Sequence, residues 1–238
     1  MKFQYLYGIN PIIAAIKAQR RISQKLMVCE PIEEKAQIIS LARQSGIPIE
    51  AVAKFKLEKF APNKPHQGLV LKTSEITPHK INQVQSLNVD SFPFWLCLDE
   101  ISDPQNLGAI LRVAQFFNIS GVLLSAYGSA PLSPAVAKVS SGAVETLNIC
   151  SVDDMPKFLK KAKESSWRVL GTGKGVDLNS VLPKPKTILV LGNEGKGLRE
   201  RVKKECQEIV WIKGGTETVD SLNVATATSV FVNALKIS

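Results

Sequence analysis

Histidine is almost absent from this chain, and long apolar runs are missing. Only His66 and His79 occur among the 238 residues, so a serine–histidine–aspartate hydrolase is poorly supported. No apolar run approaches the roughly 18 residues that span a membrane, and the first residues lack the basic, apolar and small-residue succession of a secretory signal. We therefore expect no membrane partner.

Cysteine is scarce and widely spaced. The four cysteines, Cys29, Cys97, Cys150 and Cys206, form no C-x-x-C pair. A disulfide framework or a zinc cage is therefore not expected, and a reducing compartment is the natural setting. The sequence offers no other metal-ligand pattern, so we expect no metal.

The nucleotide-binding motifs of common α/β enzymes are also missing. The glycine-rich segments 171–175 and 192–197 lack the closing Lys-Ser/Thr of a phosphate loop. No predicted strand leads into a G-x-G-x-x-G segment with an acidic residue about 20 positions further on. NTPase and dehydrogenase functions are minor alternatives, and any one of these loops alone is best explained as an ordinary turn after a strand.

Positive charge is concentrated near the N-terminus. The net charge is +9, and residues 1–75 hold twelve lysines and arginines against six acidic residues. Two-thirds of the excess thus lies in the first third of the chain. A basic module beside a nearly balanced one suggests docking to a polyanion by the first and chemistry by the second. Taken alone, the charge slightly favours the simpler explanation of a merely soluble basic surface.

Strand and helix patterns alternate along the whole chain, which predicts an α/β fold with a parallel sheet covered on both faces. Residues 1–75 form a small α/β unit, the polar segment 76–92 is expected to be a linker, and residues 93–238 form the second domain. We expect strands at 25–29, 47–52, 68–72, 94–98, 121–124, 168–171, 187–192 and 209–212, and helices from 10, at 32–45, 105–117, 134–141, 156–165 and 223–235.

Three short blocks carry a family resemblance. They are residues 106–112 (NLGAILR), 191–197 (LGNEGKG) and 221–225 (SLNVA). In this order and spacing they resemble the three motifs of the SpoU (TrmH-type) branch of the SPOUT RNA methyltransferases. The resemblance implies a SPOUT domain with a C-terminal trefoil knot, preceded by a small ribosomal-protein-like RNA-binding domain. It also implies methylation of a ribose 2′-hydroxyl in RNA, with S-adenosylmethionine as cofactor.

The resemblance assigns positions to the cofactor and to catalysis. The catalytic candidates are Asn106, Arg112, Glu194, Ser221 and Asn223. The cofactor-binding candidates are Leu170, Gly171, Thr172, Leu191, Gly192, Gly197, Ile212, Leu222 and Ala225. Without the resemblance, a helix cap at Asn106 or Ser221, and a surface ion pair of Arg112 with Glu194 or another acid, are the simpler explanations.

Arg112 is considered to activate the hydroxyl in this family, but a guanidinium stays protonated in proteins. We expect Arg112 instead to bind the adjacent phosphate and to stabilise the developing alkoxide. We expect Arg112 to lie two turns from Asn106, on the same side of one helix. One departure from the family is the third loop, where Ile212-Lys213-Gly214-Gly215 replaces Ile-Pro or Ile-Pro-Met.

The substrate follows from the resemblance and from the basic N-terminal unit. The expected substrate is large-subunit rRNA, methylated at a guanosine. The expected enzyme is a homodimer whose active site uses residues of both subunits. A tRNA guanosine 2′-O-methyltransferase is the alternative within the class, and an RNA-binding ribosome-assembly factor is the non-enzyme alternative. The expected compartment is the bacterial cytoplasm, or the mitochondrial matrix with its presequence absent.

Overall fold

The chain folds into two compact units. The structure, a computed structural model, describes residues 2–87, 93–216 and 218–236. The first unit comprises Met1–Thr77 and Pro131–Thr146, and the second comprises Pro78–Ala130 and Leu147–Ser238. The part of the expected linker at 88–92 lies outside the described residues.

The first unit contains a four-stranded sheet in the order β1-β4-β2-β3. Strands β1 and β2 run antiparallel to β4, and β3 runs parallel to β2. The elements are β1 (Phe3–Tyr7), α1 (Ile9–Ala18), β2 (Ser23–Val28), η1 (Glu33–Lys35), α2 (Ala36–Gln44), β3 (Ile49–Ala51), α3 (Lys54–Phe60), β4 (Leu69–Ser74), α5 (Pro134–Val139) and η3 (Ala143–Glu145). This confirms the expected α/β character of the N-terminal region.

The two faces of this sheet are covered unequally. Alternate strand residues such as Leu6, Leu26 and Leu71 are fully buried toward α1 and α2, as the two-residue period of a strand requires. On the other face, Leu57 and Ala61 from α3 and its C-terminal cap pack with strand residues including Tyr7, Met27 and Val70. Because α3 has only seven residues, it covers only part of that face.

Residues 131–146 are held in the first unit by a buried ion pair. Arg21 donates from Nε to both carboxylate oxygens of Glu145 at 3.0 and 2.8 Å, and from Nη1 to the carbonyl of Ser74 at 3.0 Å. Both charged side chains have no solvent exposure. Gly142, in a left-handed conformation, packs on α1 so closely that a Cβ would meet Ala14 Cβ at 2.5 Å. The segment therefore belongs to the N-terminal unit, although it lies between two strands of the second sheet.

The second unit is built on a seven-stranded parallel sheet in the order β11-β9-β10-β6-β7-β8-β5. Its elements are β5 (His79–Lys80), η2 (Val84–Ser86), β6 (Phe94–Asp99), α4 (Pro104–Phe116), β7 (Gly121–Ser125), β8 (Ile149–Val152), α6 (Met155–Glu164), β9 (Arg168–Asp177), η4 (Leu178–Ser180), β10 (Thr187–Gly192), α7 (Glu200–Lys203), β11 (Glu208–Trp211) and α8 (Val224–Leu235). The predicted parallel sheet is confirmed.

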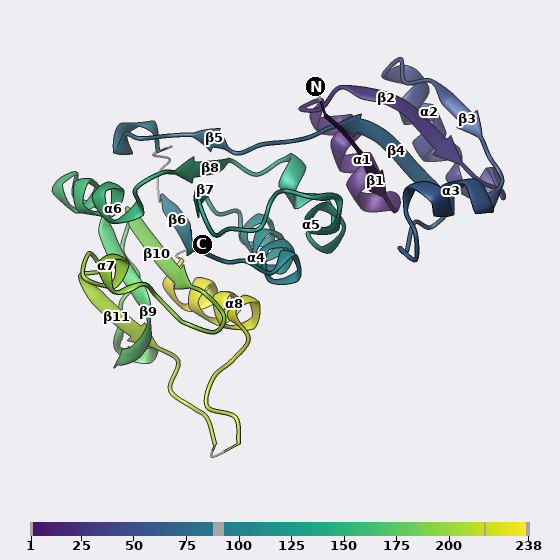
Figure 1. Ribbon diagram of the computed structural model, residues 1–238. Helices are drawn as coiled ribbons and strands as arrows, with labels where there is room; N and C mark the ends of the chain where they lie inside the picture. Colours follow the sequence, from purple (N-terminus) through teal and green to yellow (C-terminus); the bar gives the residue numbers. More distant parts are fainter. Residues whose placement is uncertain (1, 88–92, 217, 237–238) are drawn as a thin grey trace. The chain divides into compact units, whose positions relative to one another are not determined.

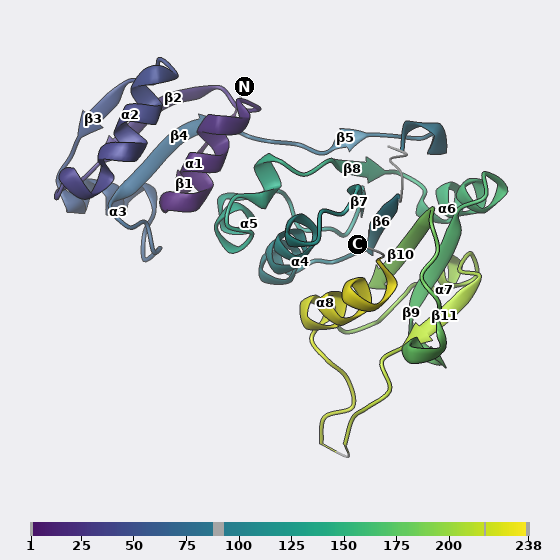
Figure 2. The same cartoon turned by 180° about the vertical axis from the view of Figure 1, so that it is seen from behind.

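Helices cover both faces of this sheet, and β6 and β10 at its centre are buried along their whole length. Helices α4 and α8 pack against each other, and α8 contacts β10 (Figure 1). The view from behind shows the same pairing of α4 with α8 (Figure 2). Helices α6 and α7 pack together, and α6, with residues such as Phe158 and Leu159, closes the other face over Trp95 and Val169.

Two strands of this sheet were missed from the sequence. Part of the expected linker forms β5, which pairs with β8 through His79 and Cys150. β5 has only two residues, both exposed, so it lacks the apolar pattern from which a strand is predicted. β8 is apolar at three of its four positions and was overlooked.

The ion pair of Arg21 with Glu145 makes a stability prediction. Arg21→Leu leaves the buried Glu145 carboxylate without its partner, so we expect the free energy of unfolding to fall by about 3–5 kcal/mol. Adding Glu145→Leu should recover part of that loss, because an apolar pair no longer buries a charge. Urea denaturation measures both changes. The control is Lys25→Leu, which breaks the half-exposed Lys25–Glu50 pair and should cost no more than about 1 kcal/mol. An equal cost in the two single variants would contradict this account.

Candidate active site

Three loops meet at one edge of the second sheet. Strands β11, β9 and β10 are neighbours, and in a parallel sheet their carboxyl ends lie at the same edge, where ligands bind in open α/β folds. A cavity of about 600 Å³ opens there. It is lined by Thr172, Gly173, Lys174, Leu191, Gly192, Asn193, Glu194, Gly197, Val210, Trp211, Ile212, Gly214, Gly215, Val219, Asp220, Ser221, Leu222, Asn223, Val224, Ala227 and Phe231.

The loop after β10 is closed on itself. Asn193 and Gly197 exchange two backbone hydrogen bonds, of 3.0 and 2.9 Å. Gly192 faces this turn so closely that a Cβ there would overlap the backbone of Gly197 and Leu198. Gly197 has φ of 69°, a conformation that glycine adopts without steric cost. Gly192 and Gly197 are therefore required by the path of the backbone, whereas Gly195 is not.

Asn193 holds this loop to the end of β6. Its Nδ2 donates to the carbonyl of Glu100 at 2.9 Å, and its Oδ1 accepts from the amides of Gly195 and Lys196 at 3.0 and 3.2 Å. One side chain thus satisfies three backbone groups, which fixes the position of Glu194 between them.

Arg199 makes the second attachment of the loop to β6. The Asp99 carboxylate is fully buried and accepts from Nε of Arg199 at 2.8 Å and from the Arg199 amide at 3.1 Å. Arg199 also pairs with Glu100 at 2.7 Å. Partial burial lowers the pKa of Arg199, but the hydrogen bond and charge of Asp99, with the charge of Glu100, outweigh it and leave the pKa raised. The guanidinium therefore remains charged at any physiological pH.

One residue from each of the three sequence blocks meets in a polar cluster. Asn106 donates from Nδ2 to Oε1 of Glu194 at 3.0 Å, and its Oδ1 accepts from Nδ2 of Asn223 at 2.8 Å. Asn223 also caps α8, because its Oδ1 accepts from the amides of Ala225 and Thr226 at 2.9 and 3.4 Å. Glu194 and Asn223 line the cavity, so the cluster lies at its rim.

Neither Asn106 nor Ser221 caps a helix, so the simpler explanation of these two residues as caps is wrong. The cap of α4 is Asp103, whose carboxylate accepts from the Gln105 amide at 2.8 Å, and Asn106 is free to reach Glu194. The cap of α8 is Asn223, while Ser221 donates its hydroxyl hydrogen to Asp220 at 3.0 Å. Ser221 lines the cavity without contacting the polar cluster in any hydrogen bond of the described residues.

Arg112 lies apart from the polar cluster. Six residues along a helix turn the side chain by about 120° from that of Asn106, so the expectation that both lie on one side of α4 was wrong. Arg112 is exposed, and it joins no ion pair among residues 2–87, 93–216 and 218–236. The expected simpler partner, Glu194, bonds to Asn106 instead.

Six of the nine predicted cofactor positions line the cavity, namely Thr172, Leu191, Gly192, Gly197, Ile212 and Leu222. Leu170, Gly171 and Ala225 do not. Leu170 is fully buried within the sheet, Ala225 is buried beneath the first turn of α8, and a Cβ on Gly171 would meet Sγ of Cys206 at 2.7 Å. These three residues are close in sequence to lining residues but lie outside the lining itself.

The apolar wall of the cavity was not predicted from the sequence. Trp211 ends β11, and Ala227 and Phe231 lie on α8. The signal for the α8 wall was present: Asn223, Ala227 and Phe231 recur at every fourth position, which places them on one face of a helix. Trp211 directly precedes the predicted Ile212 and had no comparable signal.

Two thiols of this unit, those of Cys97 and Cys206, are poor nucleophiles. Burial raises the pKa of Cys97 well above its ordinary value and raises that of Cys206 to about 12, so neither is a thiolate at neutral pH. Among the described residues, no group of three or more histidine, cysteine or acidic side chains is placed to hold a metal. No helix in the described part of the chain is long and apolar enough to cross a membrane.

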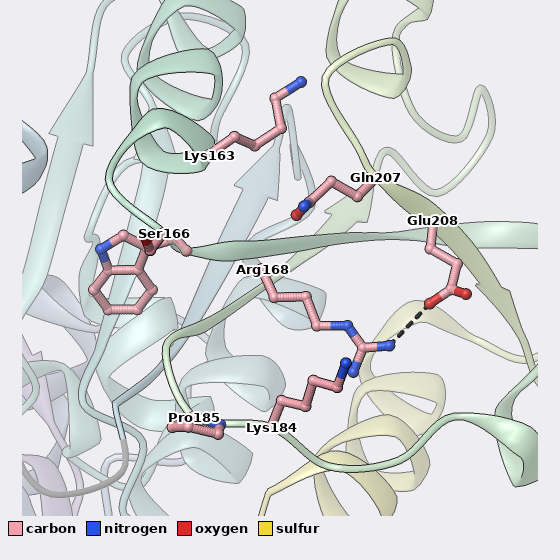
Figure 3. A pocket seen from close by; sticks show the side chains of 8 residues that line it. Lys163, Ser166, Arg168, Lys184, Pro185, Gln207 and Glu208 are labelled. Carbon is pink, nitrogen blue, oxygen red and sulfur yellow. Dashed lines mark hydrogen bonds and ion pairs between the residues drawn. The ribbon is translucent and has the colours of Figure 1, made fainter.

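A second cavity, of about 520 Å³, lies where β9 and β10 begin, and it includes Lys163, Arg168, Lys184 and Glu208. Figure 3 shows Arg168 directed at Glu208, an ion pair of 2.9 Å. Lys163 is paired with Glu205 at 2.7 Å. Because two of its cations are already neutralised and it lies at the amino ends of the strands, it is the poorer candidate for the active site.

The family of the chain is established by comparison with known proteins. Residues 93–233 match the SpoU rRNA Methylase family, and residues 5–79 match the RNA 2′-O ribose methyltransferase substrate-binding domain. The chain belongs to the SpoU rRNA methylase family. The three sequence blocks and the cavity that they surround are thus features of a SpoU protein.

Individual relatives agree with this assignment. The mitochondrial rRNA methyltransferase 1 of Dictyostelium discoideum is 34% identical over 84% of this chain, which spans 44% of that relative's length. The 23S rRNA (guanosine-2′-O-)-methyltransferase RlmB of Pectobacterium atrosepticum is 30% identical over 95% of both chains. The crystal structure of an AdoMet-bound rRNA methyltransferase from Sinorhizobium meliloti has the same fold, with a TM-score of 0.78 at 21% identity over 98% of this chain and 86% of that one.

We predict that two glycines of the closed loop after β10 differ in how much a side chain there destabilises the fold. Gly192→Val places a side chain against the backbone of Gly197 and Leu198, so we expect a loss of about 1–3 kcal/mol in the free energy of unfolding. Gly195→Val is the matched control, because a Cβ there would meet nothing closer than the Asn193 side-chain oxygen, at 3.8 Å. Urea denaturation of both variants measures the difference. Equal stability of the two would show that the loop does not need the close approach at Gly192.

Proposed function

We propose that this chain methylates the ribose 2′-hydroxyl of a guanosine in large-subunit rRNA, with S-adenosylmethionine as the methyl donor. The observation that carries the proposal is the cluster of Asn106, Glu194 and Asn223, which joins the three sequence blocks at the rim of the cavity. Membership of the SpoU family and the rRNA methyltransferases among its relatives support it.

The cavity fits S-adenosylmethionine in size and chemistry. Ligands of this size occupy sites of about 300–1,000 Å³ that are mainly apolar with a few placed polar groups. Leu191, Ile212 and Trp211 provide apolar surface for a flat base. Gly192, Gly214 and Gly215 leave backbone amides and carbonyls accessible to its edges. The bound donor supplies an activated methyl group, so no metal is required.

The side chains at the rim would orient the reacting ribose. Displacement at a methyl carbon requires the 2′-oxygen to be aligned with the donor and its proton to leave. Asn106 holds Glu194 and Asn223 in fixed positions at the cavity mouth, where both can bind the ribose. We assign Ser221 to the same rim on its position in the cavity lining. The proton leaves to a neighbouring phosphate or to water.

Arg112 acts on the RNA side, and we propose that it serves the site of a second subunit. It is exposed on α4, about 120° around the helix from Asn106, and it forms no hydrogen bond with the cluster of its own chain among the described residues. A twofold dimer brings the same surface of two copies together. Helices α4 and α8, which pack against each other, expose Phe116 and Val230 respectively. In such a dimer, Arg112 binds a phosphate of the RNA and stabilises the developing alkoxide in its partner's site.

We also propose that the C-terminal part forms the trefoil knot of SPOUT domains. The contact of α8 with α4, and the bond from Asn223 to Asn106, bring the end of the chain back to the first helix of the sheet domain. The compartment is the bacterial cytoplasm, with the mitochondrial matrix as the alternative, since relatives occur in both bacteria and mitochondria.

The substrate is tested by mapping 2′-O-methyl groups. Cells with and without the protein should differ at a guanosine of large-subunit rRNA. A site lost from tRNA instead would establish the tRNA alternative. No lost site in either RNA, together with RNA binding, would establish the ribosome-assembly alternative.

We predict that substitution of Arg112 lowers methyl transfer without changing the affinity for the cofactor. Arg112→Ala should lower methyl transfer by about 100- to 1,000-fold, the usual cost of losing one donor to a developing charge. The affinity for S-adenosylhomocysteine, measured by calorimetry, should stay within about twofold because Arg112 does not line the cavity. Arg201→Ala, an exposed arginine of α7, is the matched control and should retain activity. Equal loss of cofactor affinity in Arg112→Ala would refute this division of roles.

Mixing two inactive variants tests the shared site. In a heterodimer of Arg112→Ala with Glu194→Gln, one of the two sites combines an intact Glu194 with an intact Arg112 from the other chain. Random exchange of subunits should therefore restore about one quarter of wild-type activity. Light scattering on the same samples reports the oligomeric state. Activity that stays at background in a confirmed mixed dimer would place Arg112 in the site of its own chain.

A further inference from the structure

The face of the N-terminal sheet that α3 covers is open at one end. Tyr7 and Val70 lie opposite each other and are covered by Leu57 of α3. Two residues further along the strands, Tyr5 lies opposite Lys72. Side chains alternate along a strand, so Tyr5 and Lys72 share this face with Tyr7 and Val70.

Three aromatic rings and two lysines gather at this open end. Lys25 lies opposite Lys72 on the other neighbouring strand, so Tyr5, Lys72 and Lys25 form one row across the sheet. The ring of Phe60, from the last turn of α3, lies 4.7 Å from the ring of Tyr5, centroid to centroid. Nζ of Lys72 lies 5.4 Å from the centre of the Phe3 ring. We call Phe3, Tyr5, Lys25, Phe60 and Lys72 the ring cluster.

Packing within the unit does not account for the ring cluster. Phe3 and Tyr5 are only half-buried and Phe60 is 37% exposed, so the rings retain surface in contact with water. Two lysines directly opposite each other destabilise a sheet. Glu50 neutralises Lys25 at 2.7 Å, whereas Lys72 has no carboxylate partner among the described residues. The cluster therefore combines partly exposed rings with one lysine that has no carboxylate partner among the described residues.

An unpaired nucleotide has the matching chemistry. Its base offers a flat surface that stacks on an aromatic ring whatever its sequence, and its phosphate pairs with a cation. Bases inside a duplex are already stacked on each other and do not reach such a platform. The net positive charge of residues 1–75 favours a polyanion over an uncharged or acidic peptide at this surface.

We propose that the ring cluster binds an unpaired nucleotide of the substrate RNA, with its base stacked on Tyr5 and Phe60 and its phosphate paired with Lys72. This inference rests on the proposed function, in which the substrate is RNA. The cluster then selects substrates that present a single-stranded segment to the N-terminal unit, and phosphate contacts elsewhere add affinity without such selection.

Fluorescence anisotropy on the full chain tests this proposal. The probes are a labelled single-stranded oligouridylate and an RNA duplex of equal length. Tyr5→Leu and Phe60→Leu should each weaken binding of the single strand by about 5- to 100-fold, the usual effect of losing one stacked base, and change duplex binding by less than about twofold. Tyr5→Phe keeps the ring and should bind as wild type, which separates stacking from a folding defect.

Two further variants locate the effect. Phe55→Leu removes a ring that is 65% exposed on the same helix but lies away from Leu57, the residue that faces the sheet, and it should leave single-strand affinity unchanged. Lys72→Gln should weaken binding and reduce its dependence on salt, because one phosphate contact is lost. A bromouridine-substituted single strand should cross-link to the peptide that contains Tyr5.

Several results would overturn the proposal. These are unchanged single-strand affinity in folded Tyr5→Leu and Phe60→Leu, equal losses for single strand and duplex, or an equal loss in Phe55→Leu. The proposed function is judged separately, by S-adenosylhomocysteine binding and methyl transfer at saturating RNA. Both should be unaffected in the ring-cluster variants, and their absence from the wild-type protein would refute the function without deciding the stacking site.

Discussion

The attachment of one loop to one strand end determines the geometry of the candidate active site. Residues 193–199 are fixed to the carboxyl end of β6 at two points, through Asn193 to the Glu100 carbonyl and through Arg199 to the buried Asp99. Glu194 lies between these points, and the closed turn at Gly197 leaves it little freedom. Asn106 then extends this fixed position to Asn223 and so to the start of α8. The cavity, the cluster and the last helix all depend on that attachment.

The elements with strong local patterns could be predicted from the sequence. Continuous apolar strands such as β6 and β10, and helices with a cap and apolar spacing such as α4, follow from short-range rules. The meeting of Asn106, Glu194 and Asn223 was also anticipated, but from the resemblance to SpoU proteins rather than from any local signal. The two exposed residues of β5 offer no pattern to recognise, whereas β8 is as short and as apolar as the predicted β11 and was overlooked. Helix geometry also places Arg112 about 120° around α4 from Asn106, so the expectation that both lie on one side of the helix could have been corrected from the sequence.

The placement of residues 131–146 had no sequence signal at all. The segment reads as an ordinary helix between two strands of a parallel sheet, and its membership of the N-terminal unit depends on Arg21, more than 120 residues away in the chain. A buried charge is retained only with its partner, so Glu145 ties this part of the sheet domain's sequence to the N-terminal unit. Removing residues 1–75 would therefore strip the partner of Glu145 and uncover α5. Point substitutions on the surface of the N-terminal unit are the cleaner way to separate docking from chemistry.

The distribution of charge supports the proposed separation of docking from chemistry. The cavity lining carries two carboxylates, Glu194 and Asp220, against one lysine, Lys174, so the lining itself offers an RNA phosphate little attraction. The attraction must come from elsewhere: from the basic N-terminal unit, which supplies sequence-independent affinity, and from a cation brought to the reacting ribose. Arg112, exposed and without an ion-pair partner among the described residues, has the chemistry to be that cation. A site that is weakly negative on its own and completed by a second subunit would act only on RNA already held by the N-terminal unit. Docking would then precede chemistry because of the charge distribution alone, without a conformational change.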